Sequence, residues 1–208
     1  MTTDTLTRPR RTQAERREES RRRMLDAALD LLAERRSIRF TLAEVGEKAG
    51  YSRGLPSQTF QTKAALISAL ANHILTRSDE ETHPHQTRGE GLEAVLTTVR
   101  LLVIVSPEQM KIEHAVAVLL VEASTPDSPY REAVTSINQI VTGYISKHLR
   151  IAAAKGEIRP DIDFRAQAAL IIAAVRGMVM LWQLEPERYD LKALWRELDE
   201  TLRRGLAV

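Results

Sequence analysis

Hydrophobic residues recur at steps of three and four along most of this chain. In the first such stretch Met24, Ala28 and Leu31 are interleaved with Leu25 and Leu29. This spacing places apolar side chains on one face of an α-helix, whereas a half-buried strand would show strict alternation. No stretch of the sequence shows sustained alternation. The pattern therefore predicts an all-α fold of about nine helices.

Start and stop signals divide this pattern into separate helices. Thr41 and Glu44 have the spacing of a capping box, and Gly50 stands where the resulting short helix should stop. Ser52 and Thr62 are predicted to cap the two helices that follow. The remaining helices are expected at about 12–36, 92–105, 107–123, 128–155, 164–184 and 191–204.

The net charge of +2 is distributed unevenly. The first 70 residues hold 14 Lys and Arg against 9 Asp and Glu, a net +5, and the remainder has a net −3. A basic segment on a mildly acidic body suggests contact with a polyanion, and a solvated, charged helix is the alternative. The chain has no cysteine, which excludes disulfides, a thiol nucleophile and a zinc–thiolate site.

The sequence contains none of the catalytic motifs that we considered for an enzyme. It has no nucleophile elbow, no glycine-rich phosphate loop and no metal-ligand cluster. His83 and His85 could form half of a metal site, but such a pair without carboxylate support is usually only part of a loop. We predict that the protein is not an enzyme and has no metal and no cofactor.

Two features raise the question of a membrane. The apolar run at 166–182 is short for a bilayer span and contains Arg176, so it is predicted to be a buried helix. The arginine-rich N-terminal arm is interrupted by Glu15, Glu18 and Glu19, which weakens it as a polybasic anchor. We therefore expect no membrane partner.

Residues 41–59 have the spacing of a helix-turn-helix. A capped helix at 41–49 is followed by a tight turn, in which Gly50 can adopt a positive φ, and by a second short helix from Arg53 onward. This arrangement crosses two helices so that the second can lie in the major groove of DNA. A capped helix pair alone is common in helical bundles, so its neighbours must support the assignment.

Three stretches around this motif resemble the DNA-binding domain of the tetracycline-repressor (TetR) family: MLDAALDLLAER at 24–35, FTLAEVGEKAGYSRG at 40–54 and FQTKAAL at 60–66. The resemblance covers about residues 21–70. It joins the alanine pair of the first helix, the capped second helix, the Ala-Gly-x-Ser turn and the Phe-x-x-Lys-x-x-Leu entry to the fourth helix. The later part resembles the family in architecture, including residues 156–161 and the pair Arg176-Gly177.

The resemblance implies a cytoplasmic homodimer that represses transcription, has a small-molecule pocket in its second domain and releases DNA when the pocket is filled. It implies three regions: 1–20 as a disordered basic arm and the start of the first helix, 21–78 as the DNA-binding domain with a connecting fourth helix, and 79–208 as the ligand-binding and dimerisation domain. Thr41 and Lys63 would contact phosphates, and others would lie on the recognition helix. The full predicted DNA-binding set is Thr41, Ser52, Arg53, Ser57, Gln58, Thr59 and Lys63.

The chain departs from the family pattern in its recognition segment. Ser57 stands where the family usually has an aromatic residue, and Pro56 is unusual. Pro56 is either about the fourth residue of a helix capped by Ser52, where it would remove a hydrogen bond, or the first residue of a shorter helix. Gly46 replaces a usual alanine, and Arg36 replaces the glycine that often ends the first helix. These departures motivate an alternative, in which the fold binds small molecules or proteins and binds DNA weakly or without specificity.

Candidate residues in the second domain are less sharply defined. Each could also be core or surface, and Arg176 could pair across a dimer interface or meet an anionic ligand. The pocket set is His114, Glu122, Tyr144, Met178 and Trp182, and the dimer set is Arg176, Gly177, Leu191, Trp195 and Leu198.

Overall fold

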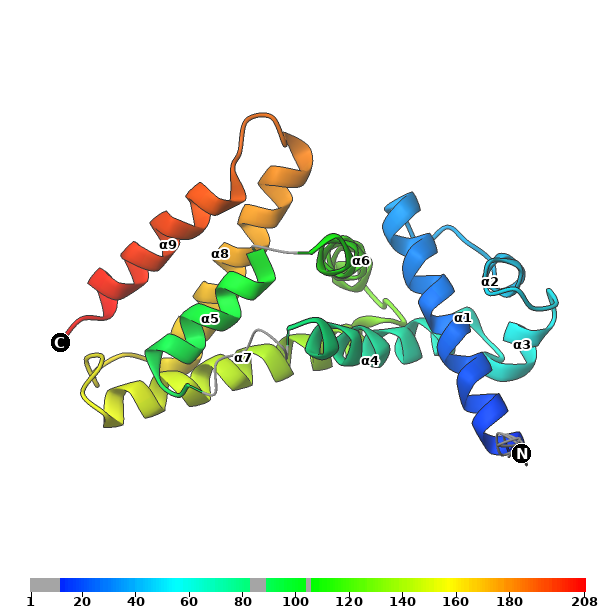
Figure 1. Ribbon diagram of the computed structural model, residues 1–208, viewed down its shortest axis with the longest axis horizontal. Helices are drawn as coiled ribbons and strands as arrows, with labels where there is room; N and C mark the ends of the chain where they lie inside the picture. The colour runs from blue at the N-terminus through cyan, green and yellow to red at the C-terminus, as the bar shows by residue number, and fades with distance from the viewer. Residues whose placement is uncertain (1–11, 83–88, 104–105) are drawn as a thin grey trace, which may run out of the picture.

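The computed structural model describes residues 12–82, 89–103 and 106–208, the last four residues of the first range by backbone only. The predictions for the N-terminal arm before residue 12 and for His83 and His85 lie outside the described residues. Within them the chain is all-helical, as predicted (Figure 1). The helices are α1 (Gln13–Arg35), α2 (Leu42–Lys48), α3 (Leu55–Phe60), α4 (Lys63–Thr82), α5 (Leu92–Val103), α6 (Pro107–Ser124), α7 (Arg131–Ala154), α8 (Phe164–Leu184) and α9 (Leu191–Leu206).

The N-terminal helices α1, α2 and α3 lie at one end of the molecule, and α4 runs from them toward its centre (Figure 1). Their inward residues form one hydrophobic core, in which Met24, Leu32, Val45, Leu66 and Leu70 have no solvent exposure. Burial of each such side chain contributes roughly 1.5–3 kcal/mol relative to leaving it in water. This core holds the two short helices α2 and α3, which could not be stable alone.

Helices α5, α7, α8 and α9 form the other end of the molecule (Figure 1). They share a second core that includes Val95, Leu149, Ile171, Val175 and Trp195. Helix α7 packs against α4, α5 and α8, so it connects the two ends.

Helix α6 belongs by packing to the first core although it follows α5 in the chain. Its residues Ile112, Ala115 and Leu119 are buried in the same cluster as the inner residues of α1 and α4. The predicted domain boundary after residue 78 assigns α6 to the second domain. The packing instead joins α6 to the N-terminal helices.

Most predicted helix ends are confirmed. The Thr41 hydroxyl accepts from the Glu44 amide and the Glu44 carboxylate accepts from the Thr41 amide, which completes the capping box. Thr62 and Ser106 accept from Ala65 and Gln109 in the same way. Gly50 and Gly156 adopt positive φ angles of 76° and 71° at helix ends, a conformation that glycine takes without steric cost.

Two predicted boundaries were wrong. Ser52 does not cap α3, because the helix begins later: its N-cap is Gly54, and the Ser52 carbonyl instead accepts from the Leu55 amide at 3.1 Å. Pro56 is thereby the second residue of α3, where a missing amide hydrogen costs little. Helix α7 begins at Arg131 rather than near residue 128, because the chain first turns through Asp127 at a φ of 56°.

Helix α8 is long and apolar enough to cross a membrane by length and composition alone, which is weak evidence because a packed helix passes the same test. It packs against α5, α7 and α9 here. The prediction that it is buried is wrong for one face, since only 28% of its most apolar window is buried. Exposed apolar residues on α8 are Leu170 (64%), Met180 (46%), Leu181 (42%) and Leu184 (73%).

The segment 156–161, which resembles the family pattern, ties three parts of the second domain together. The Glu157 carboxylate accepts from the Leu92 amide at 2.8 Å and so caps α5. Ile158 is buried in the second core, and the Arg159 amide donates to the Leu206 carbonyl at the end of α9. The role of this segment in the chain is structural.

Candidate nucleic-acid interface and ligand cavity

Helices α2 and α3 are held together by an unusually close contact. A Cβ atom at Gly46 would lie 2.6 Å from the Ser52 carbonyl oxygen and 3.1 Å from Pro56 Cδ. Two departures from the family pattern therefore explain each other: Gly46 lacks a side chain where the Pro56 ring and the turn come closest. This contact fixes how α3 leaves the turn.

The outer face of α3 presents short polar side chains. Ser57, Gln58 and Thr59 are exposed, while Pro56 and Phe60 on either side are buried and anchor the helix. The Thr59 hydroxyl donates to the Leu55 carbonyl at 2.9 Å, so it faces back along its own helix. Gln58 has no hydrogen bond of its side chain to another described residue, and its amide can both donate and accept.

Charged groups flank this face. Arg53 is exposed and pairs with Glu47 at 3.1 Å, and this ion pair links the turn to α2. Glu44 pairs with Arg35 at 2.8 Å. The hydrogen bonds from Thr41, followed by that from Arg35, lower the pKa of the Glu44 carboxyl to about 2. The exposed Thr41 hydroxyl is thus part of an ordered cap at the N-terminus of α2, a place where unpaired amides favour anions.

Lys63 lies at the start of α4 and is partly buried. Its ammonium donates to the Ile38 carbonyl and sits 4.9 Å from the centre of the Phe40 ring. Burial lowers its pKa. In this conformation the group ties α4 to the segment between α1 and α2 rather than pointing outward. Its predicted phosphate contact stays a prediction.

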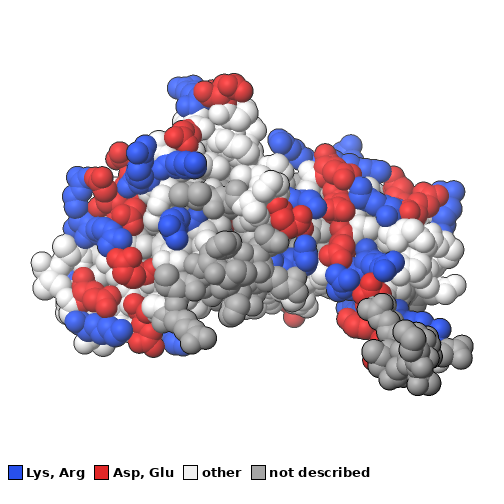
Figure 2. Space-filling model, viewed as in Figure 1, with Lys and Arg blue, Asp and Glu red and all other residues white. Residues whose placement is uncertain are grey.

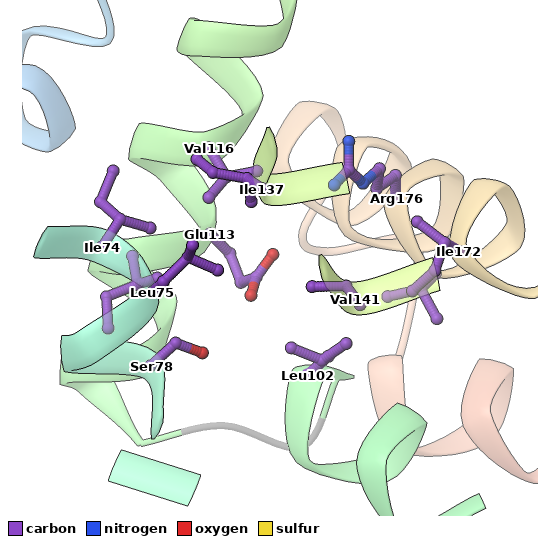
Figure 3. Close-up of a pocket in the computed structure, with 12 residues that line it drawn as sticks. Ile74, Leu75, Ser78, Leu102, Glu113, Val116, Ile137, Val141, Ile172 and Arg176 are labelled. Atoms are coloured by element: carbon purple, nitrogen blue, oxygen red, sulfur yellow. The ribbon is translucent and has the colours of Figure 1, made fainter. Parts of the chain in front are cut away.

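A cavity of about 50 Å³ lies where the two cores meet. Its walls come from α4, α5, α6, α7 and α8, and apolar side chains make up most of them. In Figure 3 the Glu113 carboxylate and the Ser78 hydroxyl point into the space, and Arg176 reaches in from α8. The lining residues are Ile74, Leu75, Ser78, Leu102, Ile112, Glu113, Val116, Ile137, Val141, Ile172, Val175 and Arg176.

Two ionisable groups share this apolar cavity. Gln109 Nε2 donates to one oxygen of Glu113 at 2.8 Å. Burial raises the pKa of Glu113 to about 7, against the opposing effects of the Gln109 hydrogen bond and the Arg176 charge. Burial likewise lowers the pKa of Arg176, against the attraction of Glu113. A perturbed acid inside a cleft marks a candidate functional site.

The five predicted pocket residues lie elsewhere. Glu122 acts electrostatically on Lys63 and Tyr130, and His114 on α6 lies near Arg36 at the end of α1. Tyr144 stacks on His148 with ring centres 4.4 Å apart, while Met178 and Trp182 pack against the second core. Sequence reasoning missed Glu113, although Gln109, Glu113 and Val116 follow one another at helical spacing on the buried side of α6, which was the available signal.

The predicted dimer residues are divided. Leu191 and Trp195 are buried in the core of their own subunit, and Leu198 is half-buried against it. Gly177 is exposed, whereas Arg176 lines the cavity. Gly177 falls in an exposed row on α8 that also holds Leu170, Ala173, Leu181 and Leu184. Figure 2 shows the connection between α8 and α9 projecting from the body, with a charged tip above an uncharged side.

Ion pairs connect α1, α4 and α6 beside the cavity. His73 Nε2 lies 2.7 Å from Asp26 Oδ1, which links α4 to α1. Arg77 of α4 pairs with Glu108 of α6 at 3.0 Å. Lys111 of α6 pairs with Asp30 of α1 at 2.9 Å, and these contacts raise its pKa. The helix that lines the cavity with Ile74, Leu75 and Ser78 is thus linked to α1 by a His–Asp hydrogen bond and to α6 by an ion pair.

Comparison with known proteins places this architecture. Residues 115–198 match the model of the tetracyclin repressor-like C-terminal domain family. An uncharacterized HTH-type transcriptional regulator of Mycobacterium bovis is 30% identical over 195 residues, which cover 87% of this chain and 94% of that protein. Its name describes a regulator of transcription, in agreement with the prediction that the chain is not an enzyme.

Solved structures share the fold. A TetR-family transcriptional regulator from Cytophaga hutchinsonii superposes with a TM-score of 0.77 at 14% identity and covers 96% of this chain and 99% of its own. The transcriptional regulator FadR from Bacillus subtilis, solved in complex with stearoyl-CoA, superposes with a TM-score of 0.69 at 18% identity and covers 88% and 98%. With the residues of the helix-turn-helix, these matches establish that the chain belongs to the TetR family of transcriptional regulators.

Proposed function

We propose that this regulator is a ligand-responsive repressor that binds a near-palindromic operator as a homodimer in the cytoplasm and releases it when a small molecule enters the second domain. The observation that carries this proposal is the position of α4. Leu66 and Leu70 of α4 support the helix-turn-helix, and Ile74, Leu75 and Ser78 of the same helix line the cavity. One continuous helix therefore contributes to both regions.

The helix-turn-helix supports the DNA-binding part of the proposal. The first 70 residues carry a net charge of +5, and the exposed face of α3 carries Gln58, which can read adenine through two hydrogen bonds. Arg53 can read guanine if it exchanges Glu47 for a base edge. We assign the predicted set, namely Thr41, Ser52, Arg53, Ser57, Gln58, Thr59 and Lys63, to this contact.

The exposed row on α8 supports the homodimer. Its positions follow one another at steps of three and four, the spacing at which helices of two copies interdigitate. Gly177 in the middle of the row lets two backbones approach closely. A twofold axis through this row would make the same surface serve both subunits and would present two copies of α3 to one face of the DNA.

Release follows if a ligand favours a different position of α4. The core that α4 shares with α1 and α6, together with the polar links among these helices, couples a shift of α4 to the support of the helix-turn-helix. A ligand with higher affinity for that second arrangement would shift the population away from the spacing that fits the operator. FadR binds stearoyl-CoA, and its low identity transfers no ligand to this chain. The effector class must come from the cavity itself.

Selection from random duplexes tests operator binding. We expect an enriched palindrome whose affinity falls steeply as salt rises, because phosphate contacts release counterions. Gln58→Ala should relax preference at one position per half-site by about 1–3 kcal/mol, while Gln139→Ala on the exposed face of α7 should not. Binding without an enriched palindrome would favour the alternative, a small-molecule or protein-binding module on the same fold.

Sedimentation of charge variants tests the dimer. Leu181→Glu places a charge in the exposed row and should give a monomer. Val121→Glu is the matched control, because Val121 is an apolar residue on α6 outside the row and is at least as exposed as Leu181 (58% against 42%). Retention of the dimer in Leu181→Glu, or its loss in Val121→Glu, would mean that the row is not the interface.

A further inference from the structure

The cavity between the cores contains one guanidinium that lacks a counter-ion. In the described part of the chain no carboxylate oxygen lies within 4.0 Å of the Arg176 guanidinium. Glu113 acts on it only at longer range. Burial lowers the pKa of Arg176, yet a guanidinium keeps its proton in proteins. Arg176 is half-buried. A partly desolvated cation that makes no ion pair is costly, so this wall favours an incoming anion.

The acid across the cavity has a free side. Gln109 satisfies one oxygen of Glu113, and the other oxygen has no hydrogen bond to a described residue. The groups that face Glu113 are Ser78 from α4, Leu102 from α5, Ile137 and Val141 from α7, and Arg176 from α8. Among these described groups Arg176 alone is charged.

We propose that the effector is a small apolar carboxylic acid whose carboxylate binds between Arg176 and Glu113, and that one proton is taken up with it and held by Glu113. This inference rests on the proposed function, because it takes the cavity as the effector site. It adds the chemical class of the effector and a dependence of its affinity on pH.

The chemistry of the two groups selects this class. A carboxylate can accept two parallel hydrogen bonds from a guanidinium, which neutralises the charge of Arg176. Two carboxylates in one apolar cavity cannot both stay ionised, so Glu113 becomes protonated and donates to the ligand. Glu113 is poised for this because burial already raises its pKa to about 7. An alcohol would leave the guanidinium charge uncompensated, and an ammonium ion would face it.

The remaining walls set the size. A volume of about 50 Å³ is room for only a few water molecules, so without movement of the walls the tail is a short chain of roughly four to six carbons. Ile74, Val116 and Ile172 offer aliphatic surface for it.

Calorimetric titration of the full-length dimer with hexanoate, hexan-1-ol and hexylamine tests the class. These three probes share one tail and differ in the head group. We expect hexanoate to bind at least about tenfold more tightly than hexan-1-ol, which corresponds to about 1.4 kcal/mol, and hexylamine not to bind. Equal or tighter binding of hexan-1-ol or hexylamine, or no binding of hexanoate, would overturn the inference.

The pH dependence gives a second readout. Bound carboxylate raises the pKa of Glu113 further, so the complex holds more protons than free protein plus ionised hexanoate. The affinity for hexanoate should therefore fall as pH rises above about 7, by up to about tenfold per pH unit. Binding should not release a proton into the buffer. Affinity that rises with pH would contradict proton uptake.

Variants separate the two groups. Arg176→Met removes the charge at similar length and should weaken hexanoate at least about tenfold without changing hexan-1-ol, while Arg176→Lys should restore part of the affinity. Glu113→Gln keeps a donor and should bind hexanoate without the pH dependence. Glu197→Gln, an exposed residue of α9, is the matched control. If Arg176→Met binds hexanoate normally in protein whose circular dichroism is unchanged, Arg176 is not the anchor.

Release of the selected operator by the same three probes distinguishes this inference from the proposed function. If a neutral or cationic compound releases the operator and hexanoate does not bind, the repressor stands and the inference fails. If hexanoate binds with proton uptake but never affects DNA, the inferred ligand class of the cavity stands and the proposed function fails.

Discussion

The N-terminal helices and the second domain treat their polar groups differently. In the described residues of α1, α2 and α3 no buried side-chain nitrogen or oxygen lacks a hydrogen-bond partner. On α6, α7 and α8 several do: Gln109 Oε1, His114 Nε2, Asn138 Oδ1, Ser146 Oγ, His148 Nδ1 and Gln183 Nε2. Such an atom costs about 1–3 kcal/mol when neither protein, water nor ligand binds it. The buried polar atoms of α1, α2 and α3 are thus all hydrogen-bonded, whereas α6, α7 and α8 keep buried polar atoms that are free to bind another group.

The largest expected effect comes from breaking the completed region. Phe60→Ala removes a buried ring under α3 that also contacts the Arg21 guanidinium at 5.1 Å. We expect a loss of about 3–5 kcal/mol in urea unfolding and no DNA binding. Phe164→Ala, at a half-buried ring with a similar arginine contact, should cost clearly less. Equal losses in the two variants would contradict the importance of this anchor.

Removing the charge of Glu113 in the cavity should increase the stability of the protein rather than decrease it. The pKa of Glu113 is raised to about 7 from its usual 4.5, so its ionisation disfavours the folded state. That penalty is absent below about pH 4.5 and grows as pH rises toward 7. Glu113→Gln should therefore be more stable than the natural chain at pH 8 by up to about 3 kcal/mol, and equal to it at about pH 4. Thermal unfolding across this range is the measurement, and a variant that is less stable at pH 8 would rule out the penalty.

Filling the contact between α2 and α3 should have an intermediate effect. A methyl group at residue 46 meets the backbone of Ser52, which cannot move without shifting α3. Gly46→Ala should cost about 1–3 kcal/mol and weaken operator binding more than effector binding. Gly143→Ala is the control, because nothing lies within 4 Å of its added carbon. Wild-type stability and operator affinity in Gly46→Ala would show that the turn tolerates the change.

The smallest effect concerns the cap of α2. The pKa of Glu44 is depressed to about 2, so the cap contributes stability that is present above about pH 4.5 and is lost as pH falls toward 2. The difference in melting temperature between the natural chain and Glu44→Gln should be constant near neutrality and vanish in acid. A difference that persists at about pH 2 would mean that the carboxylate is not the stabilising form.

Local signals explain what the sequence could predict. Thr41, Thr62 and Ser106 cap helices through contacts within four residues, so their positions can be read from the chain. The sequence left two starts open for α3. The shorter helix beginning near Pro56 agrees with the structure, and the choice depends on the approach of Pro56 to Gly46 ten residues earlier.

The cavity could be predicted even less. It needs five helices to converge, and the charged group across the cavity from Glu113, Arg176, lies 63 positions away in the chain. Arg176 was recognised as an ionisable residue in an apolar helix, but its surroundings are set by packing between distant segments. The residues around both groups are ordinary core residues when taken singly.

The sharing of α6 between the two halves has a consequence for building hybrid regulators. Residues 12–78 do not form a self-contained unit, since Ile112, Ala115 and Leu119 of α6 cover the inner face of α1 and α4. A chimera that joined residues 12–78 to the second domain of another regulator would expose that apolar face unless the new domain supplied a matching helix. A chimera between family members must therefore keep the buried face of α6 together with residues 12–78, or redesign both sides of the contact between α6 and helices α1 and α4.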